Sequence, residues 1–350
     1  MKQFLRPFFI IGLLLLLNNA FAGNPDRQGE AGAYELLMNP WARSAGLHTL
    51  TTANIMGVEA LQLNVAGLAR IAGKTEVLMG HSLYLQGTDI RTNAFGLGQR
   101  VGQNGVFGLS IMALDFGDIR VTTADQPEGT GATFSPSFFN IGFSYANTFE
   151  NKVSVGITLR GVSQSIADVS AFGFAIDAGV QYVTGEQDNF KFGISLRNVG
   201  SRMTYGGEGL SLQAPRPGRG NYELTYDQRA ASFELPSMLN IGLSYDFLFD
   251  DKNRLTAVGN FTANSFSRDE IGVGLEYGLS ELFMLRAAYR YELDVQNDIE
   301  ASIYSGLSAG ASVEMPLSRD KKNTRLGIDY AYRQTRIWNG THNLSVRISI

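Results

Sequence analysis

The stretch Asn343-Leu344-Ser345-Val346-Arg347-Ile348-Ser349-Ile350 carries an apolar side chain at every second position from Leu344 onward. Successive side chains of an extended chain point to opposite faces, so this pattern predicts a strand with one apolar and one polar face. The same two-residue period recurs through most of the 350 residues, as in Phe139, Ile141, Phe143 and Tyr145. Behind a secretory signal, it predicts a closed β-barrel in the outer membrane of a Gram-negative bacterium.

Residues 1–22 have the three parts of a cleaved signal peptide. Lys2 and Arg6 supply the charged region, residues 8–17 are an apolar run, and Ala20-Phe21-Ala22 offers a small-x-small cleavage site before Gly23. The apolar run is about half of the roughly 20 residues that a membrane helix needs. We therefore expect export through a cleaved signal peptide and membrane crossing by strands alone.

The composition excludes several classes of function. The chain contains no cysteine and three histidines, and its formal net charge is -4. Disulfides, thiolate metal sites and cysteine nucleophiles are therefore excluded, and the lack of a basic block argues against nucleic acid as a partner. The hydrophobic fraction of 44% beside a charged fraction of 18% suits strands with one face in lipid. We predict no cofactor and no metal site.

Alternation and turn residues predict an all-β fold, a closed antiparallel transmembrane barrel of about 14 strands. Short turns and long loops then alternate along the chain, as expected when short turns face the periplasm and long loops face outward. The two longest loops, 117–137 and 200–237, fall on the same side. The predicted strands cover residues 74–86, 90–100, 105–116, 138–149, 152–164, 171–184, 190–199, 238–249, 253–263, 269–279, 282–293, 303–315, 323–334 and 342–350.

Residues 23–73 do not alternate, and we predict that they form a plug inside the barrel formed by residues 74–350. Val58, Leu61, Val65 and Leu68 are spaced as on one face of a helix, so a short helix or helix-turn is expected there. Two G-x-G fragments, 96–98 and 272–274, lie within strands and have no helix after them, which argues against phosphate binding. Their glycines are expected to make room for the plug or to relieve curvature.

The loop 200–237 contains the run Ala214-Pro215-Arg216-Pro217-Gly218-Arg219-Gly220, which resists regular structure. A short extra hairpin is expected after it, near residues 222–233. The loop is interpreted either as a solvated surface loop or as an element that docks a partner.

The polar faces of the predicted strands carry charges of both signs. Charges in a dry interior are costly unless paired, so we predict that these residues bind one another, the plug or water. The alternative is a conduction or substrate path, although a selective pore more often shows one dominant sign. The predicted lumen charges are Arg160, Asp177, Arg197, Asp246, Glu276, Arg286, Arg290, Glu314, Asp329, Arg333 and Arg347.

Candidate chemistry is sparse. A lipid hydrolase would need a serine beside His342, but alternation places Ser345 on the opposite face, so His342 is interpreted as a residue at the membrane rim. An acidic group could bind calcium but lacks the glycine and spacing of a known calcium loop, and it consists of Asp294, Asn297, Asp298 and Glu300. We predict no catalytic residue.

Two motifs in the plug carry a resemblance. Residues 39–46 contain an A-R-x-x-G stretch with Arg43 and Gly46, and residues 59–69 contain Asn64, Gly67 and Leu68 in an N-P-A-G-L-like arrangement, with Val65 in place of the proline. In these motifs the chain resembles the PorV/PorQ family of Bacteroidota outer-membrane proteins, whose barrels are similar to the fatty-acid transporter FadL.

The resemblance implies a non-catalytic barrel of the type IX secretion and surface-attachment machinery. Its partners would be outer-membrane lipid, other type IX components and the C-terminal signal domains of secreted cargo, bound through the outer loops. The alternative is a FadL-like channel for hydrophobic small molecules, with the plug as a hatch. The high charge of the predicted lumen favours the first interpretation, and an apolar pocket with an opening in the wall would favour the second.

Overall fold

A computed structural model describes residues 27–215, 222–250, 252–280, 282–295, 301–317 and 324–350. The predicted signal peptide lies outside the described residues. Among the residues described, no helix is both long enough and apolar enough to cross a membrane.

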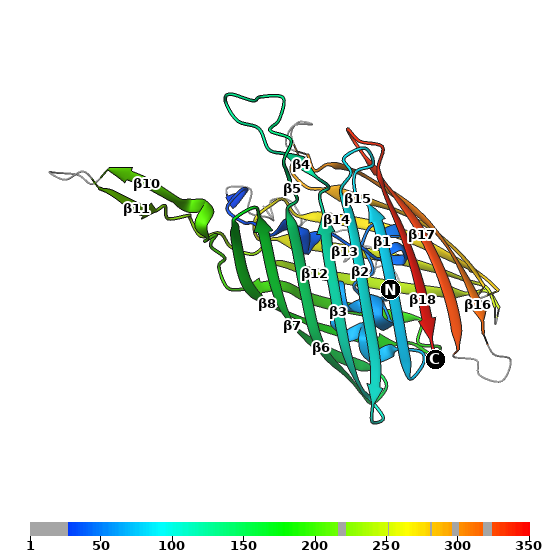
Figure 1. The fold of residues 1–350 in the computed structure, drawn as a ribbon. Coiled ribbons are helices and arrows are strands. Elements are labelled where there is room, and N and C mark those ends of the chain that lie inside the picture. Colours follow the sequence, from blue (N-terminus) through cyan, green and yellow to red (C-terminus); the bar gives the residue numbers. More distant parts are fainter. Residues whose placement is uncertain (1–26, 216–221, 251, 281, 296–300, 318–323) are drawn as a thin grey trace.

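Antiparallel strands close into one 14-stranded barrel, which confirms the predicted fold class and strand number (Figure 1). The first strand of the barrel pairs with the last, so the sheet has no open edge. Each predicted strand begins and ends within three residues of the first and last residues of an observed strand. The barrel strands are β1 (Thr75–Leu83), β2 (Arg91–Val101), β3 (Gly105–Asp115), β6 (Ser137–Phe149), β7 (Val153–Ile166), β8 (Val169–Thr184), β9 (Phe190–Gly200), β12 (Met238–Leu248), β13 (Arg254–Asn264), β14 (Glu270–Leu279), β15 (Phe283–Glu292), β16 (Tyr304–Pro316), β17 (Arg325–Thr335) and β18 (Thr341–Ser349).

The two long loops leave the barrel at the same end, which we call the outer end, and the chain terminus Ile350 lies at the other (Figure 1). The first loop contains the short pair β4 (Ile119–Arg120) and β5 (Thr133–Phe134). The second contains η5 (Glu208–Leu210) and a hairpin of β10 (Ser211–Pro215) and β11 (Glu223–Asp227). The hairpin expected at 222–233 was therefore misplaced, because β10 ends within the proline- and glycine-rich run and only β11 follows the run.

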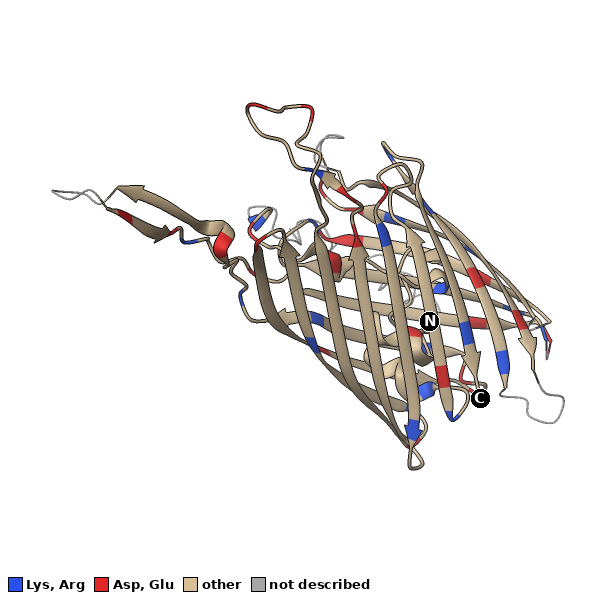
Figure 2. Cartoon of the chain, in the orientation of Figure 1, with Lys and Arg blue, Asp and Glu red and all other residues tan. Residues whose placement is uncertain are grey.

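The outward face of the barrel is apolar. Phe143, Val273 and Leu285 keep 60%, 64% and 62% of their surface exposed. The residues directly before and after each of them along its strand point into the lumen. Figure 2 shows long stretches of the strands without a charged residue. Such an outer surface suits lipid rather than water.

The plug segment lies inside the barrel as a chain of short turns, which are η2 (Tyr34–Leu37), α2 (Ala42–Gly46), η3 (Gly57–Gln62) and η4 (Val65–Arg70). The helical spacing in the sequence corresponds to two 3₁₀ segments rather than one α-helix. Trp41, Leu61 and Leu68 are buried and form one apolar cluster with Leu78 and Met112 of the wall. Apolar burial therefore fixes the plug against β1, β2, β3 and β6.

Inward-facing glycines let the plug approach the wall closely. A Cβ atom on Gly156 would lie 2.8 Å from the carbonyl of Val65, and one on Gly310 would lie 3.0 Å from the Cα of Gly46. The glycine at position 98 would meet Val58 and Ile71 at 3.0 Å, so a glycine of a predicted G-x-G fragment does make room for the plug.

Replacing one of these glycines tests the close approach. We expect Gly156→Ala to lower the free energy of unfolding by about 1–3 kcal/mol, because the added methyl group overpacks a backbone contact. Gly161→Ala on the same strand is the matched control, since its Cβ would meet Ile141 at an ordinary 3.6 Å. The measurement is urea-induced unfolding in lipid vesicles. Equal effects of the two substitutions would contradict the close approach.

Candidate functional site

One buried carboxylate gathers three cations on the lumen side. Glu276 of β14 lies 2.5 Å from Nε of Arg286, 2.6 Å from Arg254 and 3.6 Å from Arg43 of the plug. Only 2% of its side chain is exposed. Because a buried carboxylate must be compensated, this cluster binds strands β13, β14 and β15 to α2 of the plug.

The cluster continues around the wall through hydrogen bonds. Arg286 donates to Ser312 at 2.5 Å, and Ser312 in turn donates to Asp329 of β17. Glu314 of β16 pairs with Arg347 of β18 and, at 3.3 Å, with Arg325. Polar contacts thus link β13 to β18 in sequence around the charged half of the lumen.

A second cluster surrounds Arg160 of β7, whose side chain is 1% exposed. Its guanidinium donates to Asp177 at 2.7 Å, to Gln62 at 3.1 Å and to the carbonyl of Leu61 at 3.1 Å. The β8–β9 ladder shifts register beside Ile176, and there Asp177 also accepts from the backbone N–H of Asn198 at 2.7 Å. The carboxylate of Asp177 therefore stabilises the backbone at the register shift and also positions Arg160, which binds the plug.

The remaining predicted charges also face the lumen but belong to smaller groups. Arg197 donates to the carbonyl of Leu36 in the plug at 3.1 Å, and Asp246 pairs with Lys191 at 2.5 Å. At the outer end Arg290 pairs with Glu270 at 2.9 Å. Nearby, the guanidinium of Arg333 lies 4.7 Å from the ring centroid of Tyr304. The predicted charges thus form several clusters, and those of Glu276, Arg160 and Arg197 reach the plug.

The sequence analysis did not identify four carboxylates that take part in these contacts, two in the wall and two in the plug. Glu76 and Glu270 occupy inward positions of their strands, so the same alternation that found Glu276 could have found them. Glu76 accepts from the backbone N–H of Val58 at 2.8 Å. Glu35 and Glu59 lie in the plug, where no periodic pattern reveals which way a side chain points.

The motif residues of the plug stabilise its turns and its contacts with the wall. Asn64 accepts from the N–H of Ala66 at 3.2 Å and donates to the carbonyl of Thr52 at 2.8 Å. The backbone N–H of Gly67 donates to the carbonyl of Asn64 at 3.0 Å, so the turn closes although Val65 stands where the PorV/PorQ motif has proline. Leu68 is fully buried. Arg43 reaches Glu276 and Gly46 touches the wall at Gly310, as described above.

Plug carboxylates are held inside as well. Glu59 accepts from the N–H and the hydroxyl of Ser44 at 2.7 and 2.6 Å, and Glu35 accepts from Gln164 of β7 at 2.8 Å. Burial raises the pKa of both carboxyl groups above the ordinary value, and Arg43 partly offsets this for Glu59. Burial would lower the pKa of Arg43, but the carboxylates of Glu276 and Glu314 raise it, so that Arg43 stays charged.

Two cavities flank the plug. The outer cavity has a volume of about 330 Å³ and is lined by Tyr34, Leu37, Met38, Met238, Ile303 and Tyr304 together with polar groups. The inner cavity has a volume of about 520 Å³ and is lined by Met56, Met284 and several arginines, including Arg43 and Arg347. The two share no lining residue, because the plug lies between them.

The wall beside the outer cavity is interrupted. The β15–β16 ladder ends at Tyr289 and Leu307, although β15 continues to Glu292. The register of β16 against β17 shifts between Tyr304 and Ser308, around Gly306 with φ 95°. A small cavity of about 150 Å³ lies here, lined both by outward-facing Tyr289 and Tyr291 and by lumen-facing Glu270 and Arg290.

Comparison with solved structures finds the same architecture. The Ralstonia pickettii toluene transporter TbuX matches with a TM-score of 0.55 at 15% identity, over 89% of this chain and 97% of that chain. The monoaromatic hydrocarbon channel CymD matches at 0.54 and 16%, over 87% and 95%. A Pseudomonas aeruginosa FadL homologue matches at 0.50 and 12%, over 88% and 98%. No protein-family model and no curated protein sequence matches.

The chain has the fold of FadL-like outer-membrane barrels. The apolar outer face of this FadL-like barrel is the surface that an outer-membrane location requires, and the structural neighbours are transport channels rather than enzymes. At identities this low, the likeness concerns the fold.

Possible catalytic groups of the FadL-like barrel are separated. Nδ1 of His342 lies 2.7 Å from the hydroxyl of Tyr330 and its Nε2 lies 3.0 Å from Gln86 at the outer rim. Ser345 points into the lumen, where its hydroxyl accepts from the N–H of Ala42, so the two lie on opposite faces as alternation predicted. Within the described ranges no group of three or more His, Asp and Glu side chains is arranged to hold a metal ion. Of the proposed acidic cluster, Asn297, Asp298 and Glu300 lie outside these ranges.

His48 is an unusual component of the plug. It is fully buried, both of its ring nitrogens lack a hydrogen-bond partner, and its ring packs edge-on against Tyr304 with centroids 5.6 Å apart. Burial lowers the pKa of His48 well below its usual 6.5, and the positive charges of Arg290 and Arg333 lower it further. The imidazole is therefore neutral in the folded protein at neutral pH.

This burial makes the plug acid-sensitive. Below pH 6.5 the unfolded chain gains a proton at His48 that the folded chain does not bind, so the free energy of unfolding decreases as the pH falls. We expect wild type to lose more stability between about pH 7.5 and pH 5.5 than His48→Asn, which stays neutral and tolerates the positive φ of 50°. Thermal unfolding at both pH values measures this. Identical losses in both proteins would show that His48 does not titrate with unfolding.

Proposed function

We propose that this FadL-like barrel is a channel for hydrophobic small molecules across the outer membrane. The plug at residues 27–73 is its closing element, and it separates an outer cavity from an inner one. The structural neighbours TbuX and CymD are named as a toluene transporter and a monoaromatic hydrocarbon channel. Their names indicate the class of compound that a barrel of this architecture can carry.

The outer cavity is the observation that carries the proposal. Its volume of about 330 Å³ lies at the lower end of the range for small-molecule pockets. Tyr34, Leu37, Met38 and Met238 offer an apolar contact surface, and the adjoining gap between β15 and β16 offers a side route at Tyr289. The cavity is small and mixed in polarity, which suits a compact aromatic compound better than a long acyl chain.

Passage requires the plug to shift, and the contacts that hold it are non-covalent. Some lumen charges bind the plug, such as Glu276 through Arg43 and Arg160 through Gln62, and others pair within the wall, such as Arg290 with Glu270. They therefore do not contradict a route for uncharged compounds, because they hold the gate rather than line an ion path.

A bulky substitution in the outer cavity tests this function. We expect Met238→Trp to reduce toluene binding at least several-fold, because the indole would fill space that the ligand needs. Ile241→Trp on the same strand is the matched control, since that position faces outward with 36% of its surface exposed. Binding is measured calorimetrically with the purified barrel in detergent.

Two results would count against a channel. One is the absence of toluene binding to the wild-type barrel, and the other is an equal loss of binding in the cavity variant and the outward-facing control. Vesicles that contain wild-type barrel should also take up toluene faster than empty vesicles.

As a second candidate function, we propose a partner-binding barrel of the type IX secretion machinery, as in the PorV/PorQ family. Support comes from the motif residues Arg43, Gly46, Asn64, Gly67 and Leu68, which all serve to seat the plug. The loops 117–137 and 200–237 would dock cargo C-terminal signal domains or other components. The close fit of the plug favours a barrel that stays shut.

A crosslinked pull-down from native outer membranes tests the second candidate. We expect recovery of a translocon component or of cargo C-terminal domains with the tagged barrel, and loss of that recovery when residues 117–137 are deleted. Recovery of the barrel alone, from membranes in which the protein is correctly inserted, would reject this role.

A further inference from the structure

Arg333 of β17 is a buried cation that lines the outer cavity without a counter-charge. Only 4% of its surface is exposed. Within the part of the chain that the structure describes, its guanidinium forms no hydrogen bond and no ion pair, and its Nε is buried without a partner. A buried charge of this kind is costly unless an anion compensates it. Arg333 therefore differs from the lumen charges that bind the plug or pair within the wall.

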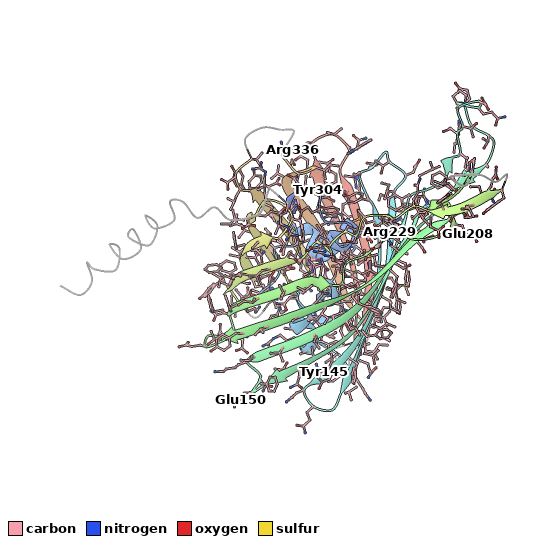
Figure 3. All side chains as sticks on the ribbon, turned by 90° about the vertical axis from the view of Figure 1, so that its left-hand side faces the viewer. Tyr145, Glu150, Glu208, Arg229, Tyr304 and Arg336 are labelled. Atoms are coloured by element: carbon pink, nitrogen blue, oxygen red, sulfur yellow. The ribbon has the colours of Figure 1, made fainter. Side chains whose placement is uncertain are left out.

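The neighbours of Arg333 hold its guanidinium in place and leave its donors free. The guanidinium lies over the ring of Tyr304, which packs against His48 and whose hydroxyl lies 3.3 Å from the hydroxyl of Thr341. A guanidinium that rests on an aromatic ring uses its face, so the N–H groups at its edge can still donate. Figure 3 shows Tyr304 toward the outer end of the barrel, opposite to Glu150. These N–H donors thus belong to the cavity that an incoming molecule meets first.

The other charges of the outer cavity do not supply the missing anion. Glu270 pairs with Arg290 at 2.9 Å, and Glu292 accepts from a backbone N–H at 2.7 Å. Arg197 binds the carbonyl of Leu36 and, within the described ranges, no carboxylate. Three arginines and two glutamates are found among the described residues that line the cavity. The lining therefore has one positive charge in excess.

The remaining lining of the cavity indicates the body of the missing anion. Tyr34, Leu37, Met38 and Met238 supply apolar and aromatic surface. The volume of about 330 Å³ is small for a ligand pocket, so the body has to be compact. A molecule that satisfies both parts of the lining carries one negative charge on a small apolar body.

We propose that the outer cavity takes a compact aromatic carboxylate, whose carboxylate accepts hydrogen bonds from the guanidinium of Arg333 while its ring packs against the apolar lining. The planar guanidinium matches a carboxylate in shape, and such charge-assisted hydrogen bonds are about twice as strong as neutral ones. One carboxylate also balances the one arginine in excess. This inference rests on the proposed channel function and names the class of compound that its outer cavity selects.

Three ligands with the same ring separate charge from shape. Benzoate, benzamide and toluene are similar in size, but only benzoate is charged at pH 7.5, since a carboxyl group titrates near pH 4. Binding of each to the wild-type barrel is measured calorimetrically in a neutral detergent. We expect benzoate to bind at least about ten-fold more tightly than benzamide, because hydrogen bonds to a charged group are the stronger kind. Acetate, which lacks the ring, and decanoate, which exceeds the cavity, should both bind more weakly than benzoate.

A substitution at Arg333 tests the residue itself. Arg333→Met keeps an extended side chain but removes the charge and the donors, so we expect benzoate affinity to fall at least about ten-fold while toluene binding changes little. Arg91→Met is the matched control, because Arg91 is an exposed residue at the outer end of β2 and does not line the cavity. Folding of each variant is verified by the heat-dependent gel shift of the closed barrel. The comparison of benzoate with benzamide needs no variant and decides the question even if Arg333→Met fails to fold.

Several results would overturn the inference. These are benzoate binding no tighter than benzamide, an equal loss of benzoate binding in Arg333→Met and Arg91→Met, and binding of acetate or decanoate as tight as that of benzoate. Toluene binding without a preference for benzoate would reject the anion site and leave the channel standing. Benzoate binding without toluene binding would support the anion site and reject uptake of uncharged hydrocarbons. Binding of neither ligand would reject both proposals.

Discussion

A buried charge without a partner is too costly to keep, and this constraint organises the inside of the barrel. Removing one partner of a buried pair typically costs 3–5 kcal/mol. Glu276 satisfies the constraint with Arg286, Arg254 and Arg43, and Asp177 satisfies it with Arg160 and a backbone N–H. Arg43 belongs to the plug, and Arg160 binds the plug at Gln62. The wall and the plug therefore supply the partners that each other's buried polar groups need.

The two halves of the lumen hold the plug by different means. Strands β1, β2, β3 and β6 present apolar side chains and glycines, against which Trp41 and Leu68 pack. Strands β13 to β18 present the charged clusters around Glu276 and Glu314. Apolar packing gives close contact, and the polar contacts fix the orientation. Smaller apolar contacts add to the charged side, where Leu47 and Leu50 pack on Val258 and Ala288.

Strand positions could be predicted because lipid outside and a filled lumen inside impose a strict alternation on every strand. The same alternation placed Arg160 and Glu276 inside and separated Ser345 from His342. It could not reveal that Asp177 sits at a register shift, because an irregularity depends on the partner strand. Nor could it place Glu59, since a plug built of 3₁₀ turns has no long period. The hairpin of β10 and β11 was misplaced because its first strand ends within the proline- and glycine-rich run instead of following it.

In the closed state the plug is an integral part of the fold, and the wall holds it as firmly as the strands hold one another. Amide hydrogen exchange of the mature barrel in lipid vesicles measures this directly. We expect the amides of Val58 and Ala66, which donate to Glu76 and Asn64, to exchange as slowly as amides within β7. Exchange as fast as in the exposed loop around Gly131 would show that the plug opens freely, and would contradict the claim.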